Sequence, residues 1–156
     1  MQRRRIVMEL RNSGKLKGVK PCMIYLKNNL GKIYNEGHAD FVMSMKDNTL
    51  YFQRISSVLK QLKPKDDFSL DLRRFREYAF FQHSFYNVLC LYDKDKRYIE
   101  IHYNKGVPDT YPTEDNISRI IKTLEERGIR EIHMEGEEVL DEESDACLLY
   151  TSDAAD

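Results

Sequence analysis

The sequence predicts a mainly β domain, a small antiparallel barrel or two-sheet roll of six to seven strands capped by one C-terminal amphipathic helix. Short stretches of alternating apolar and polar residues recur roughly every eight to twelve positions, which is typical of all-β domains. The connections between them are too short for crossover helices, so the strands are expected to pair antiparallel. The segment 113–128, TEDNISRIIKTLEERG, has helical periodicity instead. A helix of this length needs a surface to lie on, and the open end of a curled sheet provides one.

The helix prediction is based on one apolar stripe and two end signals. The stripe is formed by Ile117, Ile120, Ile121 and Leu124. Thr113 is predicted as the N-cap, where a hydroxyl can accept from exposed backbone N–H groups. Gly128 follows the last periodic residues and is predicted as a left-handed C-cap. A short strand is expected just beyond it, from Ile129 to Met134.

The strand predictions follow period-two patterns separated by turn residues. The strand-like stretches that give the six to seven expected strands cover 22–28, 32–37, 37–45, 49–55, 67–72, 75–81, 85–92 and 97–103. The pair GHADFVMSM and TLYFQRI, joined by Lys46-Asp47-Asn48, is predicted to form a hairpin, and Asp93 to Lys96 is predicted to be a tight turn. Residues 56–63 fit either a short helix or a loop, and residues 106–112 are predicted to be a loop.

The chain divides into four predicted parts. Residues 1–21 are expected to be a basic flexible arm, with at most a helical turn around 6–10. Residues 22–130 form the domain, and 131–146 are an acidic tail or the start of a truncated continuation. The last ten residues, CLLYTSDAAD, are identical to the in-frame translation of the mosaic-end adapter used in transposase-made sequencing libraries. We therefore expect 147–156 to be non-native and the natural, metagenomic chain to continue past Ala146, with Met8 or Met23 as alternative starts.

The composition argues against a highly charged nucleic-acid or membrane binder, a disulfide-rich protein and a membrane-spanning protein. The net charge of -1 over 156 residues points to neither nucleic acid nor membrane as a bulk electrostatic partner, although the first twenty residues are basic and 131–145 are acidic. The three cysteines have no C-x-x-C spacing, so neither a disulfide framework nor a zinc ribbon is indicated. No apolar run is long enough to span a bilayer, and the start has no signal-peptide pattern. A cytoplasmic location is expected.

The layout of a strand meander followed by one helix resembles the pleckstrin-homology-like (PH-like) superfold, specifically the uncharacterised bacterial PH-like domains. The segments that carry the resemblance are GHADFVMSMKDNTLYFQRI, FSLDLRRFREY, LCLYDKDKRYIEIHY and NISRIIKTLEERGI, within 22–130. The resemblance implies a barrel closed by the final helix and a binding function. The chain departs from eukaryotic members in having no Trp, so Ile120 or Leu124 would fill that place in the helix. Only Lys27 and Lys32 occupy the first hairpin, where inositol-lipid binders carry a Lys and an R-x-R.

Other constellations give weaker chemical signals. Glu100 and His102 share a strand face but have no third metal ligand, and a solvated outer face is the simpler interpretation. His83-Ser84 lacks the surroundings of a nucleophile, and Cys90 is predicted to be a buried small hydrophobe. An aromatic series is interpreted either as barrel filling or as a platform for single-stranded nucleic acid; its members are Phe75, Tyr78, Phe80, Phe81, Phe85 and Tyr86.

These observations lead to a functional hypothesis without catalytic, metal or cofactor residues. The chain is predicted to be a non-enzymatic module that binds a protein or peptide, at a sheet edge or beside the final helix near Arg119 and Lys122. The alternative is peripheral binding to anionic phospholipid or nucleic acid through the basic arm and Arg73, Arg74 and Arg76. The complete set of candidate binding residues is Lys27, Lys32, Arg73, Arg74, Arg76, Arg119 and Lys122.

Overall fold

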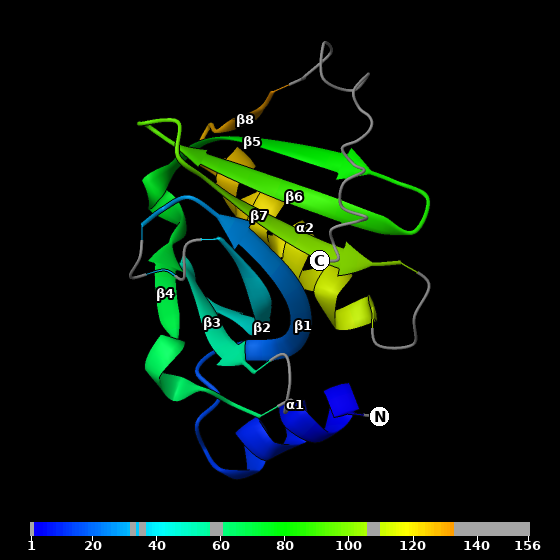
Figure 1. Ribbon diagram of the computed structural model, residues 1–156. Coiled ribbons are helices and arrows are strands. Elements are labelled where there is room, and N and C mark those ends of the chain that lie inside the picture. The colour runs from blue at the N-terminus through cyan, green and yellow to red at the C-terminus, as the bar shows by residue number, and fades with distance from the viewer. Residues whose placement is uncertain (1, 32–33, 35–36, 57–60, 106–109, 133–156) are drawn as a thin grey trace.

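Eight strands form one sheet in the order β4-β3-β2-β1-β7-β6-β5-β8 (Figure 1). This computed structural model describes residues 2–31, 34, 37–56, 61–105 and 110–132. The strands are β1 Val19–Asn28, β2 Gly37–Lys46, β3 Thr49–Ile55, β4 Phe68–Asp71, β5 Phe75–Gln82, β6 Tyr86–Asp93, β7 Tyr98–Asn104 and β8 Arg130–Glu131. The helices are α1 Gln2–Asn12 and α2 Thr110–Glu126, with 3-10 turns η2 Pro64–Asp66 and η3 Leu72–Arg74.

The mainly β prediction is confirmed, and the paired strands run antiparallel except at one edge. The β2–β3 hairpin is confirmed, with Lys46 opposite Thr49 across a two-residue turn. Only β8 runs parallel to its neighbour, β5, because it returns to the sheet after the long α2 connection. The sheet does not close on itself: β4 and β8 are its two edges. The predicted barrel is therefore seen only as an open, bent sheet.

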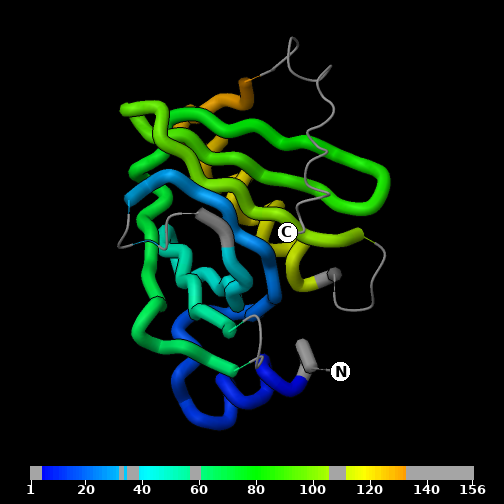
Figure 2. Tube along the Cα trace, viewed as in Figure 1, coloured from blue at the N-terminus to red at the C-terminus, as the bar shows by residue number. Residues whose placement is uncertain are grey.

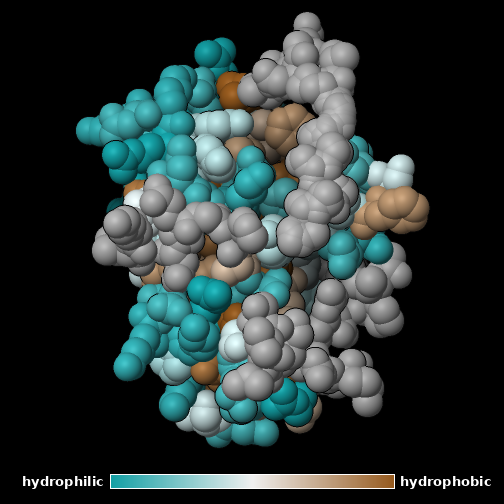
Figure 3. Space-filling model, viewed as in Figure 1, coloured by the Kyte–Doolittle hydropathy of each residue, from teal (hydrophilic) through white to brown (hydrophobic). Residues whose placement is uncertain are grey.

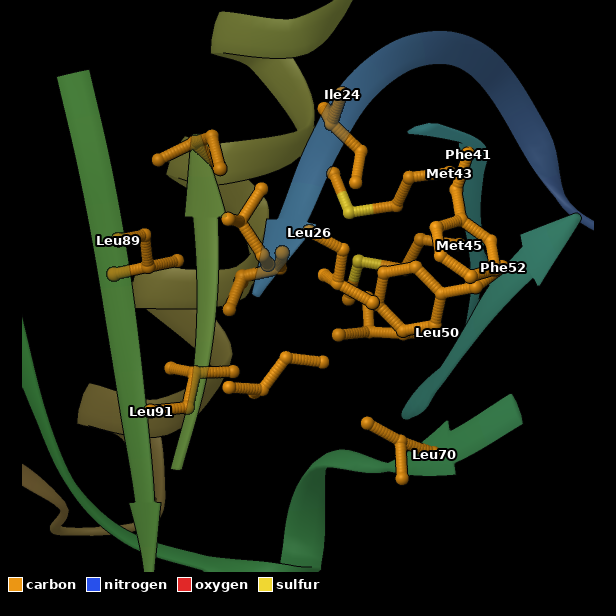
Figure 4. Close-up of a cluster of buried hydrophobic side chains, with 14 of the residues drawn as sticks. Ile24, Leu26, Phe41, Met43, Met45, Leu50, Phe52, Leu70, Leu89 and Leu91 are labelled. Atoms are coloured by element: carbon orange, nitrogen blue, oxygen red, sulfur yellow. The ribbon is translucent and has the colours of Figure 1, made fainter. Parts of the chain in front are cut away.

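The bend places two halves of the sheet on opposite sides of the main core. Strands β2, β3 and β4 contribute Phe41, Met43, Leu50, Phe52 and Leu70, whereas β6 contributes Leu89 and Leu91 (Figure 4). Strand β1 takes part in both halves, since it pairs with β2 along its length and with β7 only from Tyr25 to Asn28. The alternation of apolar residues read from the sequence thus faces one shared interior.

Helix α2 covers this interior with the predicted stripe. Ile117, Ile120 and Leu124 are buried in the main core. The C-cap prediction is confirmed: Gly128 has φ +82, and its N–H donates to Glu125 O while that of Ile129 donates to Leu124 O, a Schellman motif.

The predicted start of α2 is wrong. The helix begins at Thr110, within the predicted loop, and Thr113 is a buried residue inside it and not its N-cap. Pro112 does not prevent this, because proline lacks an N–H that the first helical turn would leave unpaired in any case. Residues 106–109, the rest of that predicted loop, lie outside the described residues.

The prediction of a flexible arm over 1–21 is wrong for most of its length, because 2–12 form α1 and β1 already begins at Val19 (Figure 2). Ile6 and Leu10, one helical turn apart, are buried against Val42 and Ile55 in a second core cluster. This cluster lies on the face of β2 and β3 that turns away from the main core. The sequence suggested only a turn here because two apolar residues are too weak a pattern without the surface that receives them.

Docking of α1 explains why β2 is buried on both faces. Val42 and Ser44 occupy positions of β2 that alternate with the core residues Phe41 and Met43, yet both are fully buried. Ser44 Oγ accepts a hydrogen bond from Gly18 N at 3.1 Å, and Gln53 donates to Lys15 O at 3.0 Å. The chain after α1 therefore lies directly on β2 and β3.

The remaining strand predictions agree with the described residues to within a few positions. The Asp93–Lys96 turn is confirmed by the bond from Lys96 N to Asp93 O at 3.1 Å. The predicted strand at 32–37 and the ambiguous segment 56–63 fall largely outside the described residues, although Leu62 forms an isolated bridge with Ile55.

Candidate functional site

The predicted basic residues do not converge on one site. Lys27 is exposed on β1, Arg119 and Lys122 are on α2, and the arginines of 73–76 surround the corner between β4 and β5. Lys32 lies outside the described residues. Chelation of a phosphate needs several cations aimed at one point, so this spread gives no support for an inositol-lipid site.

The arginines at the corner mainly bind groups of the protein itself. Arg73 forms a bidentate pair with Asp71, with Nη2 2.6 Å from Oδ2. Arg74 lies 3.4 Å from Asp93 and over the ring of Tyr34, at 5.3 Å from its centroid. Side-chain hydrogen bonds from Arg73 lower the pKa of Asp71 to about 2, so this carboxylate remains charged over a wide pH range.

Two further guanidinium groups at this corner bind main-chain oxygens. Arg76 donates to Arg73 O at 2.8 Å, and Arg127 donates to Leu72 O at 3.2 Å from the end of α2. The Arg76 bond lies within the corner, and the Arg127 bond connects the corner to the end of α2. These guanidinium groups stabilise the corner by binding groups of the protein, and they do not converge on a site for an external anion.

On α2, Arg119 donates to Asn116 Oδ1 at 3.4 Å, and Lys122 is exposed. Asn116 is fully buried and donates to Lys20 O at 2.7 Å. Arg119 therefore helps to hold the amide that joins α2 to the start of β1. Lys122 remains available on the surface.

The aromatic series separates into buried and surface residues. Phe75 and Tyr78 belong to the main core, and Phe80 is half-buried against it. Phe85, by contrast, is 82% exposed beside the β5–β6 turn. Because its members do not share one exposed face, the series does not form a stacking platform for nucleic acid.

A different aromatic group lies on the outer face of the sheet, the face that turns away from α2. His83 stacks on Tyr86 with centroids 4.5 Å apart, Tyr86 stacks on His102 at 6.1 Å, and Tyr25 meets His102 edge to face at 5.8 Å. His102 Nε2 also lies 2.8 Å from Glu100 Oε1. The Glu100–His102 contact predicted from the strand face is thus present.

Chemistry by the cysteines or by His83-Ser84 finds little support in this geometry. Cys22 and Cys90 are buried, as predicted for Cys90, and burial raises the pKa of both thiols. His83 stacks on Tyr86, and the partial loss of solvent around its ring lowers its pKa. Among the described residues, no three His, Cys, Asp or Glu side chains gather as metal ligands would.

The outer edge of β5 has a free stretch of backbone. Ile132 N donates to Tyr78 O at 2.8 Å on the β8 side, whereas His83 N donates to Tyr86 O at 2.9 Å on the β6 side. Backbone groups alternate along a strand, so Phe80 and Gln82 point outward like Tyr78. Strand β8 pairs only with Glu77 and Tyr78. Within the described part of the chain, no strand lies opposite Phe80 and Gln82.

Sequence reasoning placed Tyr98 on the strand face of Glu100 and His102, but it missed the outward register of β5 and the tyrosines that β1 and β6 bring close to Glu100. The signal for Tyr98 was present as alternation, because Tyr98 and Glu100 occupy the polar positions of β7. Which side chains meet across strands depends on register, which local patterns do not provide.

Comparison with known proteins gave no match to a family model, to a curated protein or to a solved structure. In the described ranges, no helix has the length and apolar content needed to cross a membrane.

Proposed function

We propose that the chain is a non-enzymatic, PH-like binding module and that its partner is an extended protein or peptide segment that adds a strand to β5. The observation that carries this proposal is the outward backbone of Phe80 and Gln82, which extends beyond the two-residue pairing with β8. Unpaired N–H and C=O groups at a sheet edge are a template for another chain. The meander from β1 to β7 followed by α2 supports the PH-like part of the proposal.

A side chain beside this edge supplies apolar surface for such a strand. Phe80 of β5 is half-buried and packs against the main core, so part of its ring stays accessible at this edge. An added strand alternates its side chains between two faces, so every second residue of the partner would turn toward this side of the sheet. We therefore expect the partner segment to have apolar residues at alternate positions.

Binding to an anionic surface is the less favoured function. The basic arm is a docked helix, and the arginines of the corner are engaged with Asp71, Asp93 and main-chain oxygens. Releasing them would break contacts that hold the corner together. High salt should accordingly have little effect on partner binding, whereas surface cations that bind polyanions lose affinity steeply.

Selection from a random peptide display library on the intact chain tests the proposal. Selected peptides should show alternating apolar residues and lose binding to Gln82→Pro, which removes an outward N–H without touching the bonds to β6. Ser84→Pro, in the β5–β6 turn, is the neighbouring control. Peptides that bind Gln82→Pro as tightly as the unmodified chain would show that strand addition at β5 is not the mode of binding.

A further inference from the structure

Glu100 lies at the centre of the outer face of β1, β7 and β6. Its cross-strand neighbours are Cys90 on β6 and Lys27 on β1. Along β7 it lies between Tyr98 and His102, two residues away on either side. Diagonal neighbours on adjacent strands are within reach of long side chains, which adds Tyr25 and Tyr92 to its surroundings.

The carboxylate is partly exposed and acts on its neighbours. Its side chain is 28% exposed and lies 2.8 Å from His102. Burial and then the charge of Glu100 raise the pKa of both Tyr98 and Cys90, so the carboxylate lies close to both groups. The neighbours of Glu100 are therefore phenol rings, Cys90, one imidazole and the Lys27 side chain.

The charges of the surrounding face have mostly the same sign. Asp40, opposite Tyr25, and Glu77, opposite Tyr92, share this face with Glu100. The nearby cations are Lys27, opposite Glu100, and Lys96, which pairs with Glu77. Figure 3 looks onto this face and shows hydrophilic and hydrophobic residues intermingled in the part that grey atoms leave visible. Such a surface disfavours phosphate and favours a positively charged group.

We infer that this face binds a cationic side chain, arginine or lysine, of a partner protein, with Glu100 as the counter-ion and Tyr98 and Tyr25 as the flanking rings. Cations are attracted to the negative faces of aromatic rings, and a neighbouring carboxylate adds a directional partner for a guanidinium. Tyrosine is also enriched at protein interfaces, where its ring packs while its hydroxyl remains hydrated. The site is separate from the β5 edge and stands independently of the proposed function.

NMR titration with capped peptides of glycine and serine tests this inference. One peptide carries a single arginine, and its partner carries citrulline, the neutral analogue of the same shape. The arginine peptide should shift the resonances of Tyr25, Tyr98 and Glu100 in a saturable way, and the citrulline peptide should not. Equal shifts with the two peptides would overturn the inference, as would shifts confined to other surfaces.

Variants of matched charge locate the site. Glu100→Gln keeps an acceptor for His102 and should weaken arginine-peptide binding by about threefold to fivefold, the size of one cation–π or ion-pair contact at a partly exposed site. Glu77→Gln removes a carboxylate of the same face that pairs with Lys96 at 3.3 Å and should leave binding unchanged. Lys27→Gln should tighten binding by removing a competing cation. Equal loss in Glu100→Gln and Glu77→Gln would instead indicate diffuse electrostatic attraction and contradict a site.

Discussion

Tyr78 of β5 donates a hydrogen bond to Glu125 of α2 across 2.7 Å, and this bond joins the strand that has the free edge to the helix that covers the core. The ring of Tyr78 is 2% exposed and belongs to the main core, while its hydroxyl reaches the surface of α2. The position of the β5 edge relative to α2 therefore depends in part on this one polar contact.

Tyr78→Phe should lower the free energy of unfolding by about 1 kcal/mol, because it removes the hydroxyl and leaves the ring in the core. Urea unfolding followed by circular dichroism measures the change. Tyr51→Phe is the matched control, since Tyr51 is half-buried on β3 and its hydroxyl has no hydrogen bond to another described residue. Equal stabilities of the two variants would mean that the Tyr78–Glu125 bond contributes nothing.

Alkaline pH should remove the contribution of the Tyr78–Glu125 hydrogen bond to the free energy of unfolding. Burial, together with the bond to Glu125, raises the pKa of Tyr78 in the folded chain. The folded state thus holds its phenolic proton more tightly than the unfolded state, whose tyrosine titrates near the usual value of about 10. The stabilisation is complete below that value and is lost as pH rises above it. The stability advantage over Tyr78→Phe should narrow as pH rises from about 10 to about 12. If the difference in unfolding free energy between the unmodified chain and Tyr78→Phe grew with rising pH, the raised pKa of Tyr78 would be contradicted.

Ile6→Ala tests the docking of α1. Ile6 is fully buried against β2 and β3, so its truncation should cost about 2 to 4 kcal/mol of unfolding free energy. Met8→Ala, on the same helix but at a side chain that is 49% exposed, should change stability by less than about 0.5 kcal/mol. Thermal and urea unfolding measure both changes. If residues 2–12 did not pack on the sheet, neither substitution would change the free energy of unfolding.

Substituting alanine for Gly18 and for Gly128 should destabilise the fold for two different reasons, a steric clash at Gly18 and an unfavourable φ at Gly128. A Cβ at position 18 would lie 2.6 Å from Met45 N and 2.8 Å from Ser44 Oγ, so the backbone after α1 must move. Gly18→Ala should cost about 2 to 3 kcal/mol. At Gly128 a Cβ meets nothing within 4 Å, but φ is +82, and Gly128→Ala should cost about 1 kcal/mol. Urea unfolding measures both changes. If Gly128→Ala lost more unfolding free energy than Gly18→Ala, the close backbone contact at Gly18 would not be the more costly effect.

The parts of the fold that sequence predicted well are those with local causes. The β2–β3 hairpin follows from alternation around a polar turn, and the end of α2 follows from Gly128, whose φ of +82 suits a residue without Cβ. The start of α2 was missed because Pro112 was taken as a loop residue, although proline fits the first turn of a helix.

Features that arise from contacts between distant segments could not be read in the same way. Ile6 and Leu10 form a helix face only because Val42 and Ile55 receive them. Arg73 was predicted as a binding residue from its positive charge alone, but in the structure it forms an ion pair with Asp71. The surroundings of Glu100 likewise depend on the register of β1, β7 and β6, which period-two patterns leave undetermined.

Amide hydrogen exchange on the intact chain, with and without a peptide selected for binding, tests the central claim most directly. Strand addition predicts slower exchange at Phe80 and Gln82 when the peptide is bound. The amides of Ala79 and Phe81, which face β6 in the register of β5, should change little and serve as an internal control. A bound peptide that leaves Phe80 and Gln82 exchanging at their free rates would contradict the proposed mode of binding.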